Sequence, residues 1–135
     1  EAPLIICLGF LEARFDHSLA AIHALMCLRH DRPVFLAGDT DVLLRLTGDV
    51  EVALPLGSRI SVWPLGRQSF ESSMGLRWPL TGLEMAPGEM IGISNEVSDT
   101  PVKIAATSGG DGYALIAPVE AMGAVIAAVT DGVIA

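Results

Sequence analysis

Short apolar runs, separated by turn residues at intervals of about ten residues, fill the chain after Gly38 and constrain its fold more than any other feature. Glycine and aspartate mark the turns, as in Gly38-Asp39 and Gly48-Asp49, and no helical period links the runs. This pattern is typical of an antiparallel β-sandwich with a jelly-roll-like arrangement. The expected strands occupy residues 42–46, 50–54, 59–65, 90–94, 102–107 and 113–117.

A different pattern precedes Gly38. Residues 4–8 form a continuous apolar run, which is typical of a strand buried on both faces of a parallel sheet. Residues 19–29 have a helical spacing of apolar side chains, and Asp16 or Ser18 is available to cap this helix. Residues 34–37 form a second apolar run, so this part of the chain is interpreted as one β-α-β unit.

Together these patterns predict a mainly β protein: an antiparallel β-sandwich preceded by a β-α-β remnant of an α/β, Rossmann-like domain. We expect the boundary near Gly38, with the α/β piece at 1–37 and the sandwich at 38–118. Residues 119–135 form a C-terminal tail, in which several apolar residues fall on one helical face and predict a short helix. These are Val119, Met122, Ile126 and Val129.

Composition limits the class of partner. Hydrophobic residues make up 51% of the chain and charged residues 18%, so we expect a partner or a further domain to cover part of this apolar surface. The net charge is −8, and Lys103 is the only lysine. Without a basic patch or run, a nucleic acid is not an expected partner. An acidic surface suits a cationic ligand, or solubility alone, and net charge does not separate the two.

The cysteines and the chain ends predict a cytoplasmic protein without membrane association. Cys7 and Cys27 are interpreted as free, small core residues in a reducing compartment. No basic flank precedes residues 4–11, so this run does not resemble a signal peptide. The apolar stretch 121–129 is too short to span a bilayer. The absent initiator methionine and the abrupt apolar start suggest that upstream residues have been removed.

Two clusters of potential ligands or catalytic groups have competing interpretations. His23, Cys27 and His30 fall at helical spacing on one face and could hold zinc, but a packed helix face is the favoured alternative. Asp39 and Asp41 could act as an acid–base pair, but a turn is favoured. The chain contains neither a P-loop pattern nor a Gly-x-Ser-x-Gly nucleophile elbow.

Residues 9–17 lie between the end of a predicted strand and the start of a predicted helix, where ligands bind in open α/β sheets. The helix start offers backbone N–H groups to an anion, and Arg14 can grip phosphate oxygens with two nitrogens. Asp16 could accept a hydroxyl proton, hold a metal-bound water or cap the helix. From the residues alone, capping is the favoured role.

A second candidate stretch combines Trp78, inside residues 75–80, with Ser94 and Asn95, inside residues 92–96. A flat aromatic face beside amide and hydroxyl groups can hold a flat cationic ring. The alternative, favoured from these residues alone, is a core tryptophan at a strand end and a turn formed by Ser94 and Asn95.

Four motifs, in order, resemble those of thiamin pyrophosphokinases. Residues 12–21 resemble the family's Gly-Gly-Arg-x-Asp-His-x-Leu-Ala-Asn, and residues 60–66 its Ile-Ser-Leu-x-Pro-Leu-Gly. Residues 75–80 are similar to Gly-Leu-Lys-Trp/Tyr-Pro-Leu, with Arg77 in place of the lysine, and residues 92–96 to Gly-x-Ser-Asn-Glu. The resemblance covers Gly9 to about residue 117, and the ordered set is far more specific than any single motif.

The resemblance implies transfer of a pyrophosphoryl group from ATP to the hydroxyl of thiamin, which yields thiamin diphosphate and AMP. It implies that 1–37 is the end of an α/β catalytic domain and that 38–118 is the thiamin-binding sandwich of a homodimer. The Mg2+ ion of the reaction would be bound by residues upstream of this chain, with no metal site within it. By motif position, the implied residues are Asp16 and His17 for catalysis, Arg14 for nucleotide binding, and Trp78, Ser94 and Asn95 for thiamin binding.

Two departures from the family pattern keep a second class of function open. Glu12 and Ala13 replace the two glycines that would let phosphate approach the backbone. The acidic metal-binding motifs of the family are absent, so we expect the 135-residue chain alone to be inactive. The alternative function is a non-catalytic small-ligand-binding or dimerisation module.

Overall fold

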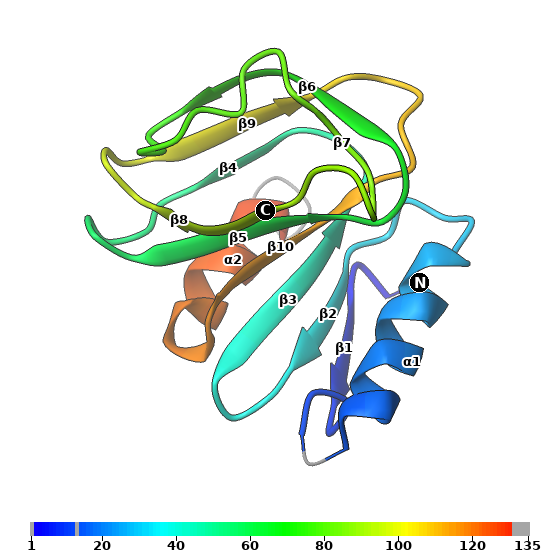
Figure 1. Cartoon of the computed structure of the whole chain (residues 1–135). Helices are drawn as coiled ribbons and strands as arrows, with labels where there is room; N and C mark the ends of the chain where they lie inside the picture. Colours follow the sequence, from blue (N-terminus) through cyan, green and yellow to red (C-terminus); the bar gives the residue numbers. More distant parts are fainter. Residues whose placement is uncertain (1, 13, 131–135) are drawn as a thin grey trace.

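The computed structural model describes residues 2–12 and 14–130, which form two β-sheets and three helical segments. The larger sheet has six strands in the order β1-β2-β3-β10-β5-β8, and the smaller has four in the order β4-β9-β6-β7. Figure 1 shows the smaller sheet lying over the β10-β5-β8 half of the larger one. The larger sheet contains β1 (Ile5–Leu8), β2 (Val34–Ala37), β3 (Asp41–Leu46), β10 (Tyr113–Pro118), β5 (Arg59–Pro64) and β8 (Gly92–Glu96). The smaller sheet contains β4 (Val50–Val52), β9 (Val102–Ala106), β6 (Gln68–Met74) and β7 (Glu84–Met85).

The expected β-α-β unit is present at the N-terminus. β1 pairs in parallel with β2, and α1 (Phe15–Met26) lies between them in sequence. Strand alternation gives β2 two apolar faces: Val34 and Leu36 pack with Leu25 of α1, whereas Phe35 and Ala37 pack in the main core. Burial on both faces explains the continuous apolar sequence of β2. The same expectation is wrong for β1, an edge strand whose Ile6 and Leu8 are exposed.

The start of α1 differs from the expected capping. Arg14 is the N-cap residue and its side chain makes no capping hydrogen bond, so the expectation that Asp16 or Ser18 caps the helix is wrong. Asp16 lies in the first turn and its carboxylate is bound by the Arg14 guanidinium. The Ser18 hydroxyl donates to the carbonyl of Phe10. The helix begins at Phe15, before the start at residue 19 that its apolar spacing predicted, and the Phe15 side chain is exposed.

The larger sheet continues across Gly38 without a break. β2 pairs antiparallel with β3, and β3 pairs antiparallel with β10. The parallel β1–β2 pair and the antiparallel strands therefore belong to one sheet. The division into 1–37, 38–118 and 119–135 stays a prediction, with residues 131–135 outside the described part. The expected class, mainly β with antiparallel sheets preceded by β-α-β, is confirmed.

All six expected strands are present, but the sequence patterns missed β6 and β7. β6 reads Gln-Ser-Phe-Glu-Ser-Ser-Met, which lacks an apolar alternation. It is held instead by Phe70, whose ring lies 5.2 Å from that of Tyr113 in an edge-on contact, and by antiparallel pairing with β9. The amide of buried Gln68 donates to the carbonyls of Ser69 and Thr107 and accepts from the N–H of Gly112. β6 is therefore stabilised by contacts with residues distant in sequence, which a local sequence pattern does not reveal.

The C-terminal helix agrees with the expectation. A 3-10 turn (Val119–Ala121) leads into α2 (Met122–Thr130), whose Val125 is fully buried in the main core. Among the described residues, no helix is both long and apolar enough to cross a membrane.

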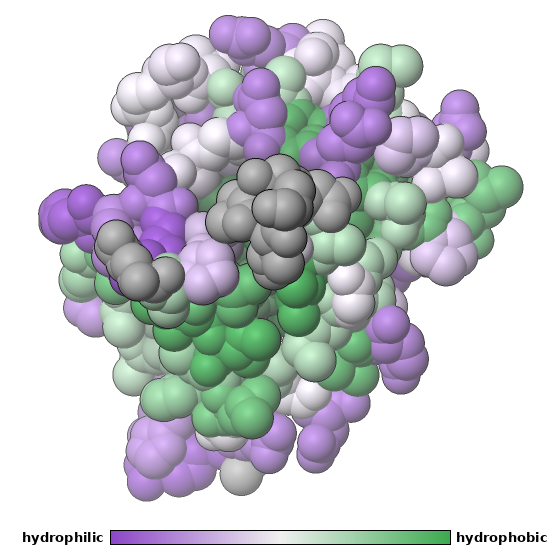
Figure 2. All heavy atoms as spheres, turned by 180° about the vertical axis from the view of Figure 1, so that it is seen from behind, coloured by the Kyte–Doolittle hydropathy of each residue, from purple (hydrophilic) through white to green (hydrophobic). Residues whose placement is uncertain are grey.

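Apolar side chains remain exposed around β1 and the start of α1. On β1, Ile6 and Leu8 alternate with Ile5 and Cys7, so they point away from α1. Figure 2 shows hydrophobic residues gathered in the lower half of the rear face, where β1, β2 and β3 lie in Figure 1. The exposed large apolar residues of this segment are Ile6, Leu8, Phe10, Phe15 and Leu19.

Candidate functional site

Trp78 lies in the connection between β6 and β7, next to β8, and its side chain is 53% exposed. The interpretation of Trp78 as a core residue is therefore wrong. The local chain is anchored by a bridge between Leu76 and Val97, and a hydrogen bond runs from the Arg77 N–H to the Glu96 carbonyl (2.9 Å). An anchored but exposed indole is available to a ligand.

The side chain of Asn95 forms hydrogen bonds with both the N–H and the carbonyl of Trp78. Its side-chain oxygen accepts from the N–H of Trp78 at 3.1 Å and from the N–H of Glu96 at 2.8 Å. Its side-chain nitrogen donates to the carbonyl of Trp78 at 2.7 Å. Asn95 is only 7% exposed, so these bonds are shielded from water. The amide of Asn95 positions the indole, and the sequence alone did not reveal this role.

Ser94 lies in a β-bulge between β5 and β8. Ile60 faces Asn95 and Val62 faces Gly92, so Ser61 alone opposes two residues of β8. Ser94 has φ of 58°, a left-handed conformation that is costly for a residue with a side chain. Its N–H donates at 2.9 Å to the hydroxyl of Ser61, which is buried in β5. Bulges re-aim side chains, and this one turns Ser94 outward while Asn95 points inward.

Ser61 is a site residue that the sequence reasoning missed. It is a polar residue between Ile60 and Val62, both fully buried. A hydroxyl in the middle of an apolar strand is the signal that could have identified it, because a buried polar group needs a hydrogen-bond partner.

Charged side chains around Trp78 are paired. The Arg77 guanidinium carbon lies 4.7 Å from the centroid of the Trp78 ring, and Arg77 also donates to the Glu96 carboxylate at 3.2 Å. Arg59, opposite Glu96 in the β5–β8 register, forms an ion pair with Asp41. Arg77 and Glu96 thus neutralise each other beside the indole, whereas the Arg59 guanidinium reaches toward β3.

The residues at the start of α1 form a second, exposed group. The Arg14 guanidinium contacts both carboxylate oxygens of Asp16, at 3.1 and 2.6 Å, and each side chain is about two-thirds exposed. The N–H of His17 donates to Asp16 at 3.0 Å, and the His17 side chain is exposed. Glu12 is exposed, whereas Ala13 lies outside the described residues. An exposed bidentate ion pair is free to exchange its partner for a phosphate.

The two groups lie far apart in the fold. Arg14 and Asp16 follow β1, which is one edge strand of the larger sheet, and Trp78 lies beside β8, the opposite edge strand. Figure 1 shows the same separation between the start of α1 and the β6–β7 connection. One small ligand therefore cannot contact both groups within a single chain.

His23 and Cys27 are exposed on α1, so the favoured interpretation of a packed helix face is wrong for these two residues, and the zinc interpretation gains no support. Cys27 Sγ lies 3.9 Å from Nε2 of His23, but His30 lies past the helix end, where its Nδ1 accepts from the N–H of Arg32. The described residues contain no cluster of three side chains that could hold a metal ion. Both cysteines are free as expected, yet Cys27 is exposed and so is not a core residue.

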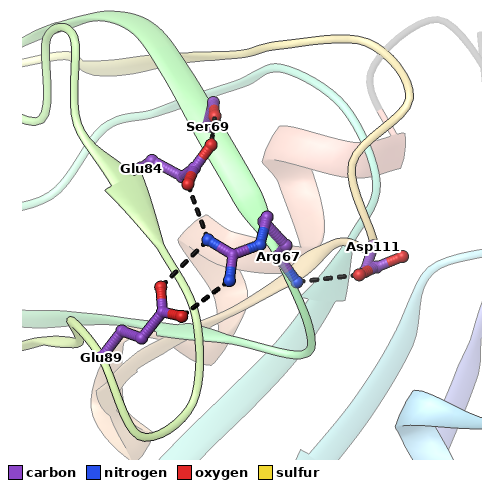
Figure 3. Close-up of polar contacts among 5 residues, drawn as sticks. All are labelled: Arg67, Ser69, Glu84, Glu89 and Asp111. Atoms are coloured by element: carbon purple, nitrogen blue, oxygen red, sulfur yellow. Dashed lines mark hydrogen bonds and ion pairs between the residues drawn. The ribbon is translucent and has the colours of Figure 1, made fainter.

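A third polar cluster lies on the β6–β7 side of the molecule (Figure 3). Arg67 binds Glu89 with two nitrogens and also binds Glu84, while its N–H donates to Asp111. The hydrogen bonds from Arg67 lower the pKa of the Glu89 carboxyl. Because the guanidinium is paired with two carboxylates, this cluster ties the hairpin to the loop of Asp111 and does not favour an anion.

Comparisons with known proteins agree with the motif resemblance. Residues 49–109 match the family model described as thiamin pyrophosphokinase, vitamin B1 binding domain. This range contains Trp78, Ser94 and Asn95 but not Arg14, Asp16 or His17.

Two curated relatives are similar over most of the chain. Thiamine pyrophosphokinase 1 of Oryza sativa subsp. japonica is 33% identical in an alignment of 109 positions that covers 77% of this chain and 41% of the relative. Thiamin pyrophosphokinase 1 of Caenorhabditis elegans is 28% identical in an alignment of 114 positions that covers 80% of this chain and 47% of the relative. The chain thus spans less than half the length of these two relatives.

Solved structures share the fold. The thiamine pyrophosphokinase of Bacillus subtilis superposes with a TM-score of 0.72 at 20% identity, over 87% of this chain and 56% of that structure. The Candida albicans thiamin pyrophosphokinase superposes with a TM-score of 0.71 at 15% identity, over 87% of this chain and 46% of that structure.

Proposed function

Because the chain corresponds to the C-terminal, thiamin-binding portion of thiamin pyrophosphokinases, we propose that the exposed face of Trp78 is its thiamin site. The observation that carries this proposal is an exposed indole whose backbone is held on both sides by a buried amide, inside the matched domain. A preorganised aromatic face binds a cationic thiazolium at low entropic cost. Ser94, the exposed neighbour of Asn95 in sequence, offers a hydroxyl as a polar partner.

We further propose that the complete protein transfers a pyrophosphoryl group from ATP to the thiamin hydroxyl. Arg14 would release Asp16 and grip phosphate oxygens, because a phosphate competes well for an exposed guanidinium. Asp16 would then be free to accept the hydroxyl proton, with His17 beside it. The free cysteines suit the reducing cytoplasm in which we propose that the protein acts.

The described residues do not fit a Mg2+ site, because they bring no three metal-ligating side chains together. We therefore derive no step through the metal from these residues. We propose that residues outside this chain bind Mg2+ in the complete protein.

A homodimer would unite the two groups. Since Trp78 and Asp16 lie at opposite edges of one sheet, a two-fold partner can bring Trp78 of one protomer to Asp16 of the other. The shared site predicts complementation in the complete protein: mixing inactive Trp78→Ala and Asp16→Ala proteins regenerates one intact site per mixed dimer. A monomer in sedimentation, or no recovery after proven subunit exchange, would refute the shared site.

Thiamin titration of the 135-residue chain tests the binding proposal. We expect saturable quenching of tryptophan fluorescence, and we expect Trp78→Ala to abolish it. The control is Trp63→Phe, which replaces the half-buried tryptophan that packs with Leu25 and Leu36, and this variant should still show quenching. Quenching that persists in Trp78→Ala would place the ligand elsewhere. In a coupled assay for AMP with ATP, magnesium and thiamin, the same chain is expected to be inactive.

Asp16→Asn in the complete protein tests the catalytic role. Asparagine preserves the size of the side chain but cannot take a proton, so kcat is expected to fall strongly. Wild-type activity would remove Asp16 from the mechanism.

The alternative function, a non-catalytic ligand-binding module, has one specific observation in its favour: exposed Glu12 would repel phosphate beside Arg14. Turnover by the complete protein would eliminate that alternative.

A further inference from the structure

The Trp78 ring already has a flat cation on one face. The guanidinium carbon of Arg77 lies 4.7 Å from the ring centroid, within the range in which an aromatic face attracts a cation. Arg77 is attached to Glu96 twice, through its N–H at 2.9 Å and through its guanidinium at 3.2 Å. The position of the guanidinium over the indole is therefore defined by the backbone as well as by the side chains.

The guanidinium matches the proposed ligand in shape and charge. Both the guanidinium and a thiazolium ring are planar cations with delocalised charge, and both are weakly hydrated enough to stack on an indole. Two such groups cannot occupy the same face of one ring. A thiazolium that binds this face must displace Arg77, and Glu96 is already in place to keep the displaced guanidinium paired.

We propose, on the premise that Trp78 binds thiamin, that Arg77 is a built-in competitor of the substrate. Its guanidinium covers one face of the Trp78 ring in the free protein and, while it stays paired with Glu96, leaves that face when the thiazolium stacks there. Arg77 thereby raises the thiamin concentration needed for binding. It also keeps the exposed indole covered when no substrate is bound.

The expected magnitude is modest. A cation–π contact at an exposed position is worth a factor of about two to five in an equilibrium constant. Arg77→Gln removes the cation and the planar stack, so it should tighten thiamin binding by about that factor. Arg77→Lys keeps the charge but replaces the flat group with a compact, hydrated ammonium, so its affinity should lie between those of the two proteins.

The control separates competition from net charge. Arg29→Gln removes one positive charge at the far end of α1, where Arg29 contacts only the carbonyls of Met26 and Leu28. It changes the net charge of the chain by the same amount, at a position remote from Trp78 where salt screens its effect on a ligand at the indole. Its thiamin affinity should equal that of the wild type.

The experiment follows the two indole N–H signals of the 15N-labelled chain by NMR during titration with thiamin. Trp78→Phe identifies which signal belongs to Trp78, and the Trp63 signal reports whether each variant is folded. In the absence of ligand, Arg77→Gln should shift the Trp78 signal and Arg29→Gln should not. With thiamin, Arg77→Gln should show a dissociation constant about two to five times lower than the wild type.

Two failures are distinguishable. If the Trp78 signal responds to thiamin but Arg77→Gln binds equally or more weakly than the wild type, Arg77 is not a competitor, while the thiamin site stands. If millimolar thiamin shifts the Trp78 signal in none of the folded variants, the proposed thiamin site is wrong and this inference falls with it.

Discussion

The two edges of the larger sheet hold their candidate residues by different means. At the β1 edge, Arg14 and Asp16 are two residues apart and form an exposed ion pair, an interaction worth about 0–1 kcal/mol. At the β8 edge, Asn95 reaches Trp78 across 17 residues of sequence through shielded hydrogen bonds. The β8 edge is preorganised by tertiary contacts, whereas the β1 edge has only local contacts that a ligand can replace.

This contrast fits a division of labour between the edges. A stacking site needs a rigid aromatic face, because a mobile side chain would lose conformational entropy each time it binds the ligand. An arginine that binds phosphate does not need a fixed position, since its charge attracts the ligand over several ångströms. The contrast predicts that removing Asn95, which supports Trp78 at the β8 edge, lowers stability, whereas breaking the Arg14–Asp16 pair at the β1 edge does not.

The largest effect on stability is expected from Asn95→Ala. The change removes three hydrogen bonds and leaves the buried backbone groups of the Trp78 connection without their partner. We expect a loss of about 2–3 kcal/mol in the free energy of unfolding, measured by urea denaturation. A loss below about 0.5 kcal/mol would show that the β8 edge is not held by Asn95.

Trp78→Ala should weaken thiamin binding while changing the stability of the fold only slightly. Because the side chain is largely exposed, its removal should change the unfolding free energy by less than about 1 kcal/mol. Thiamin affinity, measured by calorimetry, should fall by about 0.5–2 kcal/mol, the usual worth of a cation on an indole. A large stability loss in this variant would mean that the indole packs in the core after all.

Ser94→Gly should be stabilising. Glycine adopts positive φ without the steric cost that Ser94 pays, so we expect a gain of about 0.5–1 kcal/mol in thermal or urea unfolding. Ser94→Ala is the matched comparison, because alanine lacks the hydroxyl but keeps the strain. If Ser94→Gly weakens thiamin binding while Ser94→Ala does not, the bulge geometry matters more than the hydroxyl.

The smallest stability effect is expected at the β1 edge. Asp16→Asn breaks an exposed ion pair that has no buried component, so the unfolding free energy should change by less than about 0.5 kcal/mol. The melting temperature of the variant, compared with that of Asn95→Ala, measures the contrast directly. A loss as large as that of Asn95→Ala would contradict the difference between the two edges.

Much of the fold was predictable because local pattern and burial agree. Residues 34–37 are buried on both faces, and their continuous apolar run identified β2. The run at residues 4–8 identified β1 as a strand, although its Ile6 and Leu8 are exposed. β6 was not predictable, because its polar sequence is held by Phe70 against Tyr113 and by the buried amide of Gln68. These partners come from 39 to 44 residues away in the chain, beyond any local pattern.

By itself, the sequence determined which elements form and which side chains carry the family's motifs, because both depend on neighbouring residues. Tertiary structure alone decided what those side chains do. It placed Arg14 and Trp78 at opposite sheet edges, turned the amide of Asn95 into the support of the indole, and set Arg77 over the ring. The physical reason is strand order: β8 pairs with β5 and not with its sequence neighbours β7 and β9, so residues distant in sequence become hydrogen-bonded partners.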